Sequence, residues 1–143
     1  MLVSQILKAK GDLVFTVSPG ETVQSAAALL HSRRVGAMVV LDPEDTVVGI
    51  VSERDLVRVI AQEGAAGLAK PVSACMTQDV VFAALEESVN DLLARMTDRR
   101  VRHLPVVRSG RLVGIVSIGD LVKAKIAETE AEAEGLKHYI AGG

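Results

Sequence analysis

The chain has 143 residues, of which 49% are hydrophobic, and its formal net charge is −2. This composition excludes global disorder, and the length suits one ordinary domain or two small modules that share a core. The near-neutral charge argues against a general polyanion-binding protein, although it leaves room for a local basic pocket.

Cys75 is the single cysteine, so an intrachain disulfide is impossible and a cytoplasmic location is expected. It lies among apolar neighbours and is interpreted as a packed residue rather than as a nucleophile. The N-terminus lacks a basic region followed by a long apolar stretch, and no uncharged apolar run approaches about 18 residues. Neither a signal peptide nor a membrane span is therefore expected.

The first predicted elements are a helix, a strand and a second helix. Residues 3–9 carry apolar side chains at helical spacing and are followed by Gly11, which predicts a short lead-in helix. Residues 13–17 are apolar and β-branched enough for a strand, and a Ser-Pro-Gly turn follows. Thr22 suits the N-cap of a helix with one buried face, made of Val23, Ala26, Ala27 and Leu30.

A hairpin and a third helix are predicted next. Two near-continuous apolar runs, residues 35–41 and 47–51, are separated by the turn sequence Asp-Pro-Glu-Asp, which indicates paired strands. Ser52 is the expected N-cap of a helix that reaches about Glu63. Residues 64–71 are predicted to form a linker.

The same order of elements then begins again. Residues 80–83 match the first strand, and Ser88 is expected to cap a helix whose apolar face lies 66 positions after the earlier one. A second hairpin, formed by residues 104–107 and 112–116, precedes a closing helix that begins after Ser117. Each half is a β-α-β-β-α unit too small to bury its own apolar face well, so the halves are expected to pack together.

One stretch occurs in both halves: Gly-Ile-Val-Ser-x-x-Asp-Leu-Val stands at residues 49–57 and again at 114–122. An apolar run that ends in Ser, with Asp three places later, predicts a buried strand running directly into a helix with a capping box. The same geometry also offers free amides, the positive end of the helix dipole and a carboxylate to the ribose hydroxyls of a nucleotide. On the residues alone, both interpretations stay open.

The end of the chain carries two superimposed patterns. The acidic run at residues 128–134 is expected to be a solvated surface. Apolar or small residues in the same segment alternate four and three positions apart, which is a candidate seam, interrupted by Gly135, for docking on a second subunit. The seam consists of Val122, Ile126, Thr129, Ala133, Leu136 and Ile140.

The two units with Gly-Ile-Val-Ser-x-x-Asp, together with Arg-His-Leu-Pro-Val-Val at residues 102–107, resemble a tandem pair of cystathionine β-synthase (CBS) domains, or Bateman module. The likeness is to the small stand-alone bacterial members. It implies an α/β (α+β) fold of two pseudo-symmetric β-α-β-β-α repeats packed sheet to sheet. The expected order is a lead-in helix at residues 1–9, the first repeat at 10–63, a linker at 64–74, the second repeat at 75–127 and an acidic helical tail at 128–143.

The resemblance implies a non-catalytic regulatory module, because relatives hold adenosine compounds in clefts between the repeats. AMP, ADP or ATP is the expected ligand, with NAD or S-adenosylmethionine as alternatives, and the ligand would report energy or metabolite state. A homodimer and an unidentified regulated protein are the expected partners. The alternative is a ligand-independent structural dimerisation module in which the Ser-x-x-Asp boxes only cap helices.

Carried over residue by residue, the resemblance implies two clefts. The first would combine Ser52, Arg54, Asp55, Val81, Arg102, His103 and Leu104, and the second would combine Phe15, Gly36, Ala37, Met38, Ser117 and Asp120. The first is the better candidate, because Arg54, Arg102 and His103 can donate to a phosphate. At the matching place the second has Gly36 and Ala37, which carry no charge.

Other functions are not expected. The arginines at positions 95, 108 and 111 are interpreted as a solvated helix face and hairpin edge. These arginines belong to a basic stretch at residues 95–111. Nucleic-acid binding by this stretch is disfavoured because no aromatic side chains lie near it in the sequence. The three histidines are scattered singly and no motif for a nucleophile or a phosphate loop is present, so neither a metal site nor catalysis is predicted.

Overall fold

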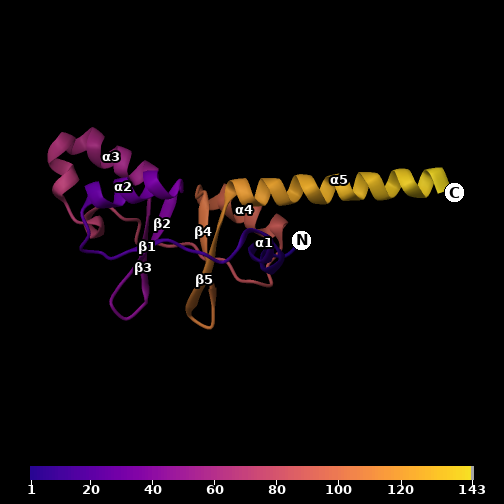
Figure 1. The fold of residues 1–143 in the computed structure, drawn as a ribbon, viewed down its shortest axis with the longest axis horizontal. Coiled ribbons are helices and arrows are strands. Elements are labelled where there is room, and N and C mark those ends of the chain that lie inside the picture. Colours follow the sequence, from indigo (N-terminus) through magenta and orange to yellow (C-terminus); the bar gives the residue numbers. More distant parts are fainter. Residues whose placement is uncertain (143) are drawn as a thin grey trace. The chain divides into compact units, whose positions relative to one another are not determined.

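A computed structural model of the chain describes residues 1–142, which form two compact units (Figure 1). Unit 1 comprises Met1–Asp12, Val81–Arg108 and the described residues from Val113 onward. Unit 2 comprises Leu13–Val80 and Ser109–Leu112. Each unit is built around one of the two repeats.

Unit 2 contains a three-stranded sheet and two helices. The sheet order is β1 (Thr16–Val17), β2 (Ala37–Leu41) and β3 (Val47–Ser52); β1 is parallel to β2, and β2 is antiparallel to β3. Helix α2 (Val23–Arg33) begins after Thr22, whose hydroxyl accepts from the Ser25 amide at 3.0 Å. Helix α3 (Glu53–Glu63) begins directly at the end of β3, as the sequence predicts.

One sequence prediction for unit 2 is wrong in extent, and one segment contains helical turns that the sequence did not predict. The strand expected over residues 13–17 shrinks to Thr16–Val17, because Leu13 is 72% exposed and lies outside the sheet. The segment expected to be a linker is instead ordered as two 3₁₀ helices, η1 (Gly64–Ala69) and η2 (Val72–Ala74). Val72 is fully buried and its amide donates to Glu21 O at 2.7 Å, so this segment belongs to the core of unit 2.

Unit 1 repeats the arrangement with a reduced first strand. Its elements are helix α4 (Val89–Arg99), the paired strands β4 (His103–Arg108) and β5 (Arg111–Ser117), and helix α5 (Ile118–Gly142). The hairpin turn and the first two residues of β5 are grouped with unit 2. The strand predicted at residues 80–83 is a single parallel bridge between Ala83 and Val106. Ser109 and Gly110 both have positive φ, which is the geometry of a tight two-residue hairpin turn.

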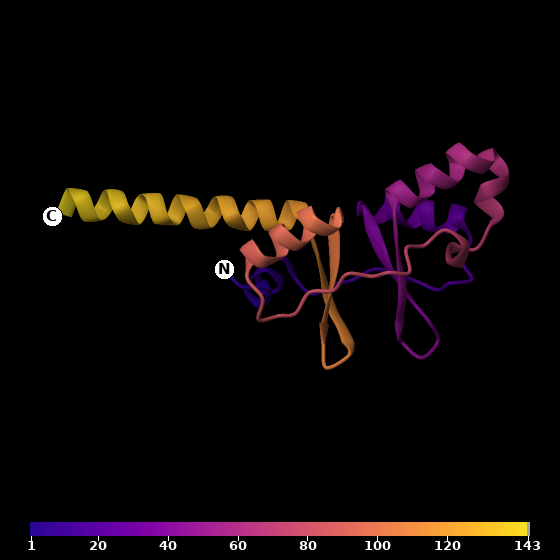
Figure 2. The same ribbon diagram turned by 180° about the vertical axis from the view of Figure 1, so that it is seen from behind.

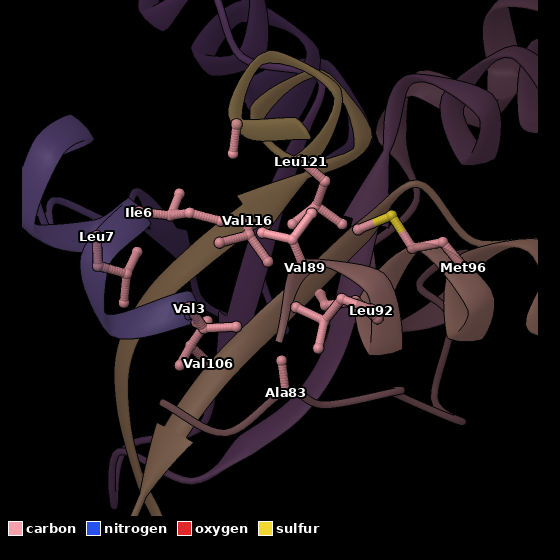
Figure 3. Packing of buried hydrophobic residues seen from close by; sticks show 12 residues of the cluster. Val3, Ile6, Leu7, Ala83, Val89, Leu92, Met96, Val106, Val116 and Leu121 are labelled. Carbon is pink, nitrogen blue, oxygen red and sulfur yellow. The ribbon is translucent and has the colours of Figure 1, made fainter. Parts of the chain in front are cut away.

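The core of unit 1 includes the lead-in helix α1 (Val3–Lys10), as Figure 3 shows. Val3, Ile6 and Leu7 are the buried residues of α1, and they pack with Val116 of β5 and Leu121 of α5. The opposite wall comes from α4 through Val89, Leu92 and Met96. The helix that precedes the first repeat therefore packs in the unit that holds the second repeat.

The segment that precedes the second repeat, from Val72 to Met76, likewise packs in the unit that holds the first repeat. The Val3 amide donates to Glu87 O at 2.9 Å in unit 1, as the Val72 amide does to Glu21 O in unit 2. A side chain from each segment also rests on a strand glycine: Leu7 on Gly114 and Met76 on Gly49. A bare α-carbon at these glycines is what allows the close approach.

Helix α5 is one continuous element through Gly135, so the predicted closing helix and acidic tail are not separate (Figures 1 and 2). Leu121 and Ala124 are buried in its first turns. The helix then runs past α1 and α4, and its side chains over residues 126–140 are exposed except for a half-buried Glu128. None of the described helices combines the length and apolar character that a membrane crossing requires.

Candidate ligand-binding junctions

The two copies of the repeated stretch fold into the same strand-to-helix junction. In unit 2 the Asp55 amide donates to Ser52 Oγ at 3.4 Å, and the Ser52 amide donates to Asp55 Oδ2 at 2.9 Å. In unit 1 the corresponding distances are 3.1 Å from the Asp120 amide to Ser117 Oγ and 2.8 Å from the Ser117 amide to Asp120 Oδ2. The predicted capping boxes are therefore present in both repeats.

Each junction also contacts the residue that precedes the first hairpin strand of its own repeat. The Glu53 amide donates to Gly36 O at 3.0 Å, and the Ile118 amide donates to Arg102 O at 2.8 Å. Ala37 lies opposite Ser52 in the sheet register. Within one unit, the structure thus brings Gly36 and Ala37 to the Ser52 junction, and within the other it brings Arg102 to the junction that contains Asp120.

The carboxylate of Asp55 is fully engaged inside unit 2. Asp55 is only 3% exposed, and its Oδ1 accepts from Arg58 Nη2 at 2.8 Å and from Thr77 Oγ1 at 3.3 Å. Its Oδ2 accepts from the amide and the hydroxyl of Ser52. Arg58 also donates to Cys75 O at 3.3 Å, so this network joins α3 to the segment that follows η2. Asp55 is a structural anchor in this conformation.

The carboxylate of Asp120 is in a different environment. Its side chain is 24% exposed, and its Oδ2 accepts from Lys10 Nζ at 2.6 Å. Burial by itself would raise the pKa of Asp120, but the hydrogen bonds from Lys10 and from the Ser117 amide outweigh it and lower the pKa. Asp120 therefore presents a charged carboxylate with exposed surface at neutral pH.

Lys10 is a residue of this site that the sequence did not predict. It comes from the end of α1 and also donates to Ile115 O at 3.0 Å. The sequence predicted no cation for the set of residues around Asp120, and Lys10 supplies one. No local sequence pattern predicts the contact between Lys10 and Asp120, because the two residues are 110 positions apart.

A surface pocket lies beside the junction of unit 2. It is lined by residues from the end of α2, from the loop before β2 and from the start of α3: Leu30, His31, Ser32, Arg34, Val35, Gly36 and Glu53. Arg34 closes α2 in the left-handed conformation, with φ of 56°. The pocket is lined by both a basic side chain, Arg34, and an acidic one, Glu53.

A family model described as the CBS domain matches the chain twice, at residues 11–62 and 72–127. The chain belongs to the CBS domain family. Its two β-α-β-β-α repeats are thus a tandem pair of CBS domains. The CBS-domain containing protein ATU1752 from Agrobacterium tumefaciens is similar to it, with 45% identity, a TM-score of 0.85, and coverage of 87% of this chain and 92% of that one.

Two similar solved structures hold adenosine compounds. The CBS domain pair of protein MJ0100, in complex with methylthioadenosine and S-adenosyl-L-methionine, has 25% identity, a TM-score of 0.80, and coverage of 90% of this chain and 98% of that one. The CBS domain protein PAE2072 from Pyrobaculum aerophilum, complexed with AMP, has 27% identity, a TM-score of 0.75, and coverage of 84% and 89%.

The remaining predicted residues of the CBS pair divide by burial. Arg54 and Arg102 are exposed, and Val81, His103 and Phe15 are half-buried. In contrast, the side chains of Ala37, Met38 and Leu104 belong to the buried cores of their CBS domains, so only their backbone groups are available to a ligand. The Phe15 ring already carries the Arg33 guanidinium 4.9 Å from its centroid, which is a cation–π contact.

Two further expectations concern Cys75 and Arg95. Cys75 is a buried free thiol, and burial, followed by the Asp55 charge, raises its pKa, so the thiolate is disfavoured. The interpretation of Arg95 as a solvated residue is wrong, because Arg95 pairs with Glu87 through both terminal nitrogens and donates to Phe82 O at 2.9 Å. Within residues 1–142 no cluster of three or more His, Cys, Asp or Glu side chains is suited to hold a metal ion.

Proposed function

We propose that this CBS pair is a non-catalytic regulatory module that binds an adenosine-containing ligand, with AMP, ADP or ATP as the preferred class. The observation that carries the proposal is the pair of junctions in which a helix N-terminus, a Ser hydroxyl and an Asp carboxylate meet beside a strand. The AMP complex of PAE2072 and the S-adenosyl-L-methionine complex of MJ0100 support the same ligand class. S-adenosylmethionine and NAD share the adenosine moiety and remain the alternative ligands.

In this proposal the ribose diol donates its hydrogen bonds to a junction carboxylate. Asp120 is already charged and partly exposed, so its carboxylate can accept such bonds without a rearrangement of the capping box. Asp55 can do so only if Arg58 or Thr77 gives up its bond to Oδ1. A nucleotide at Asp55 therefore competes with Arg58, whose side chain is half-exposed and can turn towards solvent.

The phosphate is proposed to bind cationic side chains of the first cleft. Arg54 and Arg102 are exposed, so they can make charge-assisted bonds without breaking a buried contact. Of the two sets of residues that the family resemblance implies, the first contains Arg54, Arg102 and His103, whereas Lys10 is the cation beside Asp120 in the second. We therefore propose the first cleft for phosphorylated ligands and the second for ligands recognised mainly through adenosine.

Ligand binding is proposed to act on a regulated protein by shifting the population of two arrangements of the CBS pair. Such a shift is limited by the difference in ligand affinity between those arrangements. No group in this account forms or breaks a covalent bond, so the proposed output is a change in a protein surface rather than a reaction product.

The experiment that tests the phosphate site compares AMP with adenosine by calorimetric titration. Removal of a charge-assisted bond costs about 1.5 to 3 kcal/mol, so Arg102→Ala should weaken AMP binding roughly 10- to 100-fold and leave adenosine binding nearly unchanged. Arg108→Ala, which removes an exposed arginine from the far end of β4, is the matched control. Equal losses in the two variants, or equal losses for AMP and adenosine, would contradict a phosphate contact at Arg102.

A further inference from the structure

Helix α5 carries an apolar stripe that the described residues of unit 1 leave largely exposed. Val122 is 44% exposed, Ile126 55%, Leu136 61% and Ile140 69%. The buried residues of the same helix, Leu121 and Ala124, lie on another face. The stripe begins where α5 packs on unit 1 and continues along the part that runs past α1 and α4 (Figures 1 and 2).

The stripe has the spacing of a coiled-coil seam. Its positions alternate four and three residues apart through Val122, Ile126, Thr129, Ala133, Leu136 and Ile140. In heptad notation Ile126, Ala133 and Ile140 occupy a positions, and Val122, Thr129 and Leu136 occupy d positions. A stripe confined to a and d is narrower than the face that a helix presents to a globular core, and it fits one partner helix.

The charged residues that flank the stripe select the orientation of that partner helix. The e positions hold Lys123, Glu130 and Lys137, and the g positions include Lys125 and Glu132. In a parallel pair of identical helices, a g residue faces the e residue five positions later on the partner. Lys125 then faces the partner's Glu130, and Glu132 faces the partner's Lys137, so both contacts are attractive.

The antiparallel alternative places like charges together. The alignment that covers the whole stripe sets Val122 against the partner's Ile140, and it brings e positions against e positions and g against g. Lys123 then faces the partner's Lys137, while Glu130 and Glu132 each face their own copies. The sequence of α5 thus complements a second copy of itself in one direction and repels it in the other.

We propose that α5, from Val122 to Ile140, pairs with the same segment of a second copy of this chain as a parallel, in-register, two-stranded coiled coil. The inference rests on the exposed stripe and its flanking charges and goes beyond the proposed ligand binding, since it needs no ligand. The sequence suggested that Gly135 interrupts the seam, but α5 is continuous through this residue. Gly135 occupies position c, outside the seam, and a Cβ added there meets no atom within 4 Å.

The seam is short and contains two small residues, so the pairing is expected to depend on protein concentration. Thr129 at d and Ala133 at a bury little apolar surface, and the stripe spans fewer than three heptads. The flanks carry both signs of charge, which suits a protein helix of the same sequence better than an anionic lipid surface.

The first test is a cysteine cross-link in the full chain, in a Cys75→Ala background. With Leu136→Cys, the two thiols lie side by side across a parallel seam, so oxidation with diamide should give a disulfide-linked dimer at low protein concentration. Glu134→Cys, on the outer face of the same turn, is the matched control and should remain largely monomeric on a denaturing gel. In an antiparallel pair Leu136 would face the partner's Ile126, so absence of the cross-link overturns the proposal.

The second test reverses charges and measures dimer dissociation by analytical ultracentrifugation. Lys137→Glu places two acids opposite each other in the parallel pair and should weaken the dimer about tenfold, whereas in the antiparallel pair it would create an attraction to Lys123 and strengthen it. Glu132→Lys should weaken the dimer similarly, and an equimolar mixture of the two variants should restore it. A dimer unaffected by both changes, or a chain that is monomeric at every concentration, overturns the proposal.

Discussion

Lys10 and Asp120 form an ion pair across 110 positions of the chain, with Nζ 2.6 Å from Oδ2. The contact joins the end of the lead-in helix α1 to the first turn of α5, and it shares an oxygen with the capping box of Ser117. A residue outside both copies of the repeated stretch thus helps to lower the pKa of one of the two junction carboxylates.

This pair gives the stability of unit 1 a defined pH dependence. The pKa of Asp120 is lowered below its ordinary value of 3.8, so its contribution is present above that pH and is lost as the pH falls through the lowered pKa. We expect wild type to be more stable than Lys10→Ala at about pH 7 and the difference to shrink below about pH 4. Urea denaturation over this range measures it. Lys8→Ala is the control, and a difference that stays constant on acidification would contradict the account.

The two junction aspartates should differ in their effect on stability. Asp55→Ala removes a buried carboxylate that accepts four hydrogen bonds, and the four donors lose their acceptor. We therefore expect the free energy of unfolding to fall by about 2 to 4 kcal/mol. Asp120→Ala, with a partly exposed side chain, should cost about 1 kcal/mol. Chemical denaturation compares them, and equal losses would show that Asp55 is not the anchor that its burial indicates.

Replacement of the strand glycines Gly49 and Gly114 by Ala should destabilise the protein to different extents. A Cβ at Gly49 would lie 2.5 Å from Met76 Sδ and 3.1 Å from the backbone oxygen of Thr77, whereas the three atoms nearest to a Cβ at Gly114 all belong to the side chain of Leu7. A flexible side chain can move more easily than the Thr77 backbone oxygen, which accepts from the Ile50 amide at 3.0 Å, so Gly49→Ala should lose about 2 to 3 kcal/mol and Gly114→Ala about 1 kcal/mol. Thermal unfolding of the two variants provides the comparison. The reverse order would mean that the lead-in segments do not rest on these glycines.

Gly135→Ala should stabilise α5 without touching its seam. The added Cβ meets no atom within 4 Å, and replacement of Gly by Ala inside a helix is worth about 1 kcal/mol. Because a parallel coiled coil needs both helices formed, the variant should raise helicity by circular dichroism and tighten the dimer. If helicity rose while the dissociation constant stayed the same, pairing through α5 would be excluded.

The helices of this fold follow from local sequence signals. Thr22, Ser52 and Ser88 cap helices where the sequence predicts them, because an N-cap and a 3.6-residue apolar period are properties of a few neighbouring residues. The strands were less predictable. A short apolar run such as residues 13–17 becomes a strand only where a partner pairs with it, and β2 pairs with its last two residues alone.

The exchange of the lead-in segments could have been found from a weaker signal. Val-Ser opens both segments, at Val3 and at Val72, and an apolar side chain follows four positions later as Leu7 and Met76. This offset of 69 differs from the 66 and 65 of the repeat, so a search at the main period misses it. The burial of Asp55 had no local signal, since Thr77 lies 22 positions away.

A thermal-shift panel on the purified chain would show whether the CBS pair binds adenosine-containing ligands. A ligand that binds only the folded state raises the unfolding midpoint by mass action. We expect a concentration-dependent rise with AMP, ADP or ATP that GTP does not reproduce, and that Arg102→Ala reduces while Asp98→Asn leaves it intact. No shift with these nucleotides, NAD or S-adenosylmethionine, or an equal shift with GTP, would contradict it.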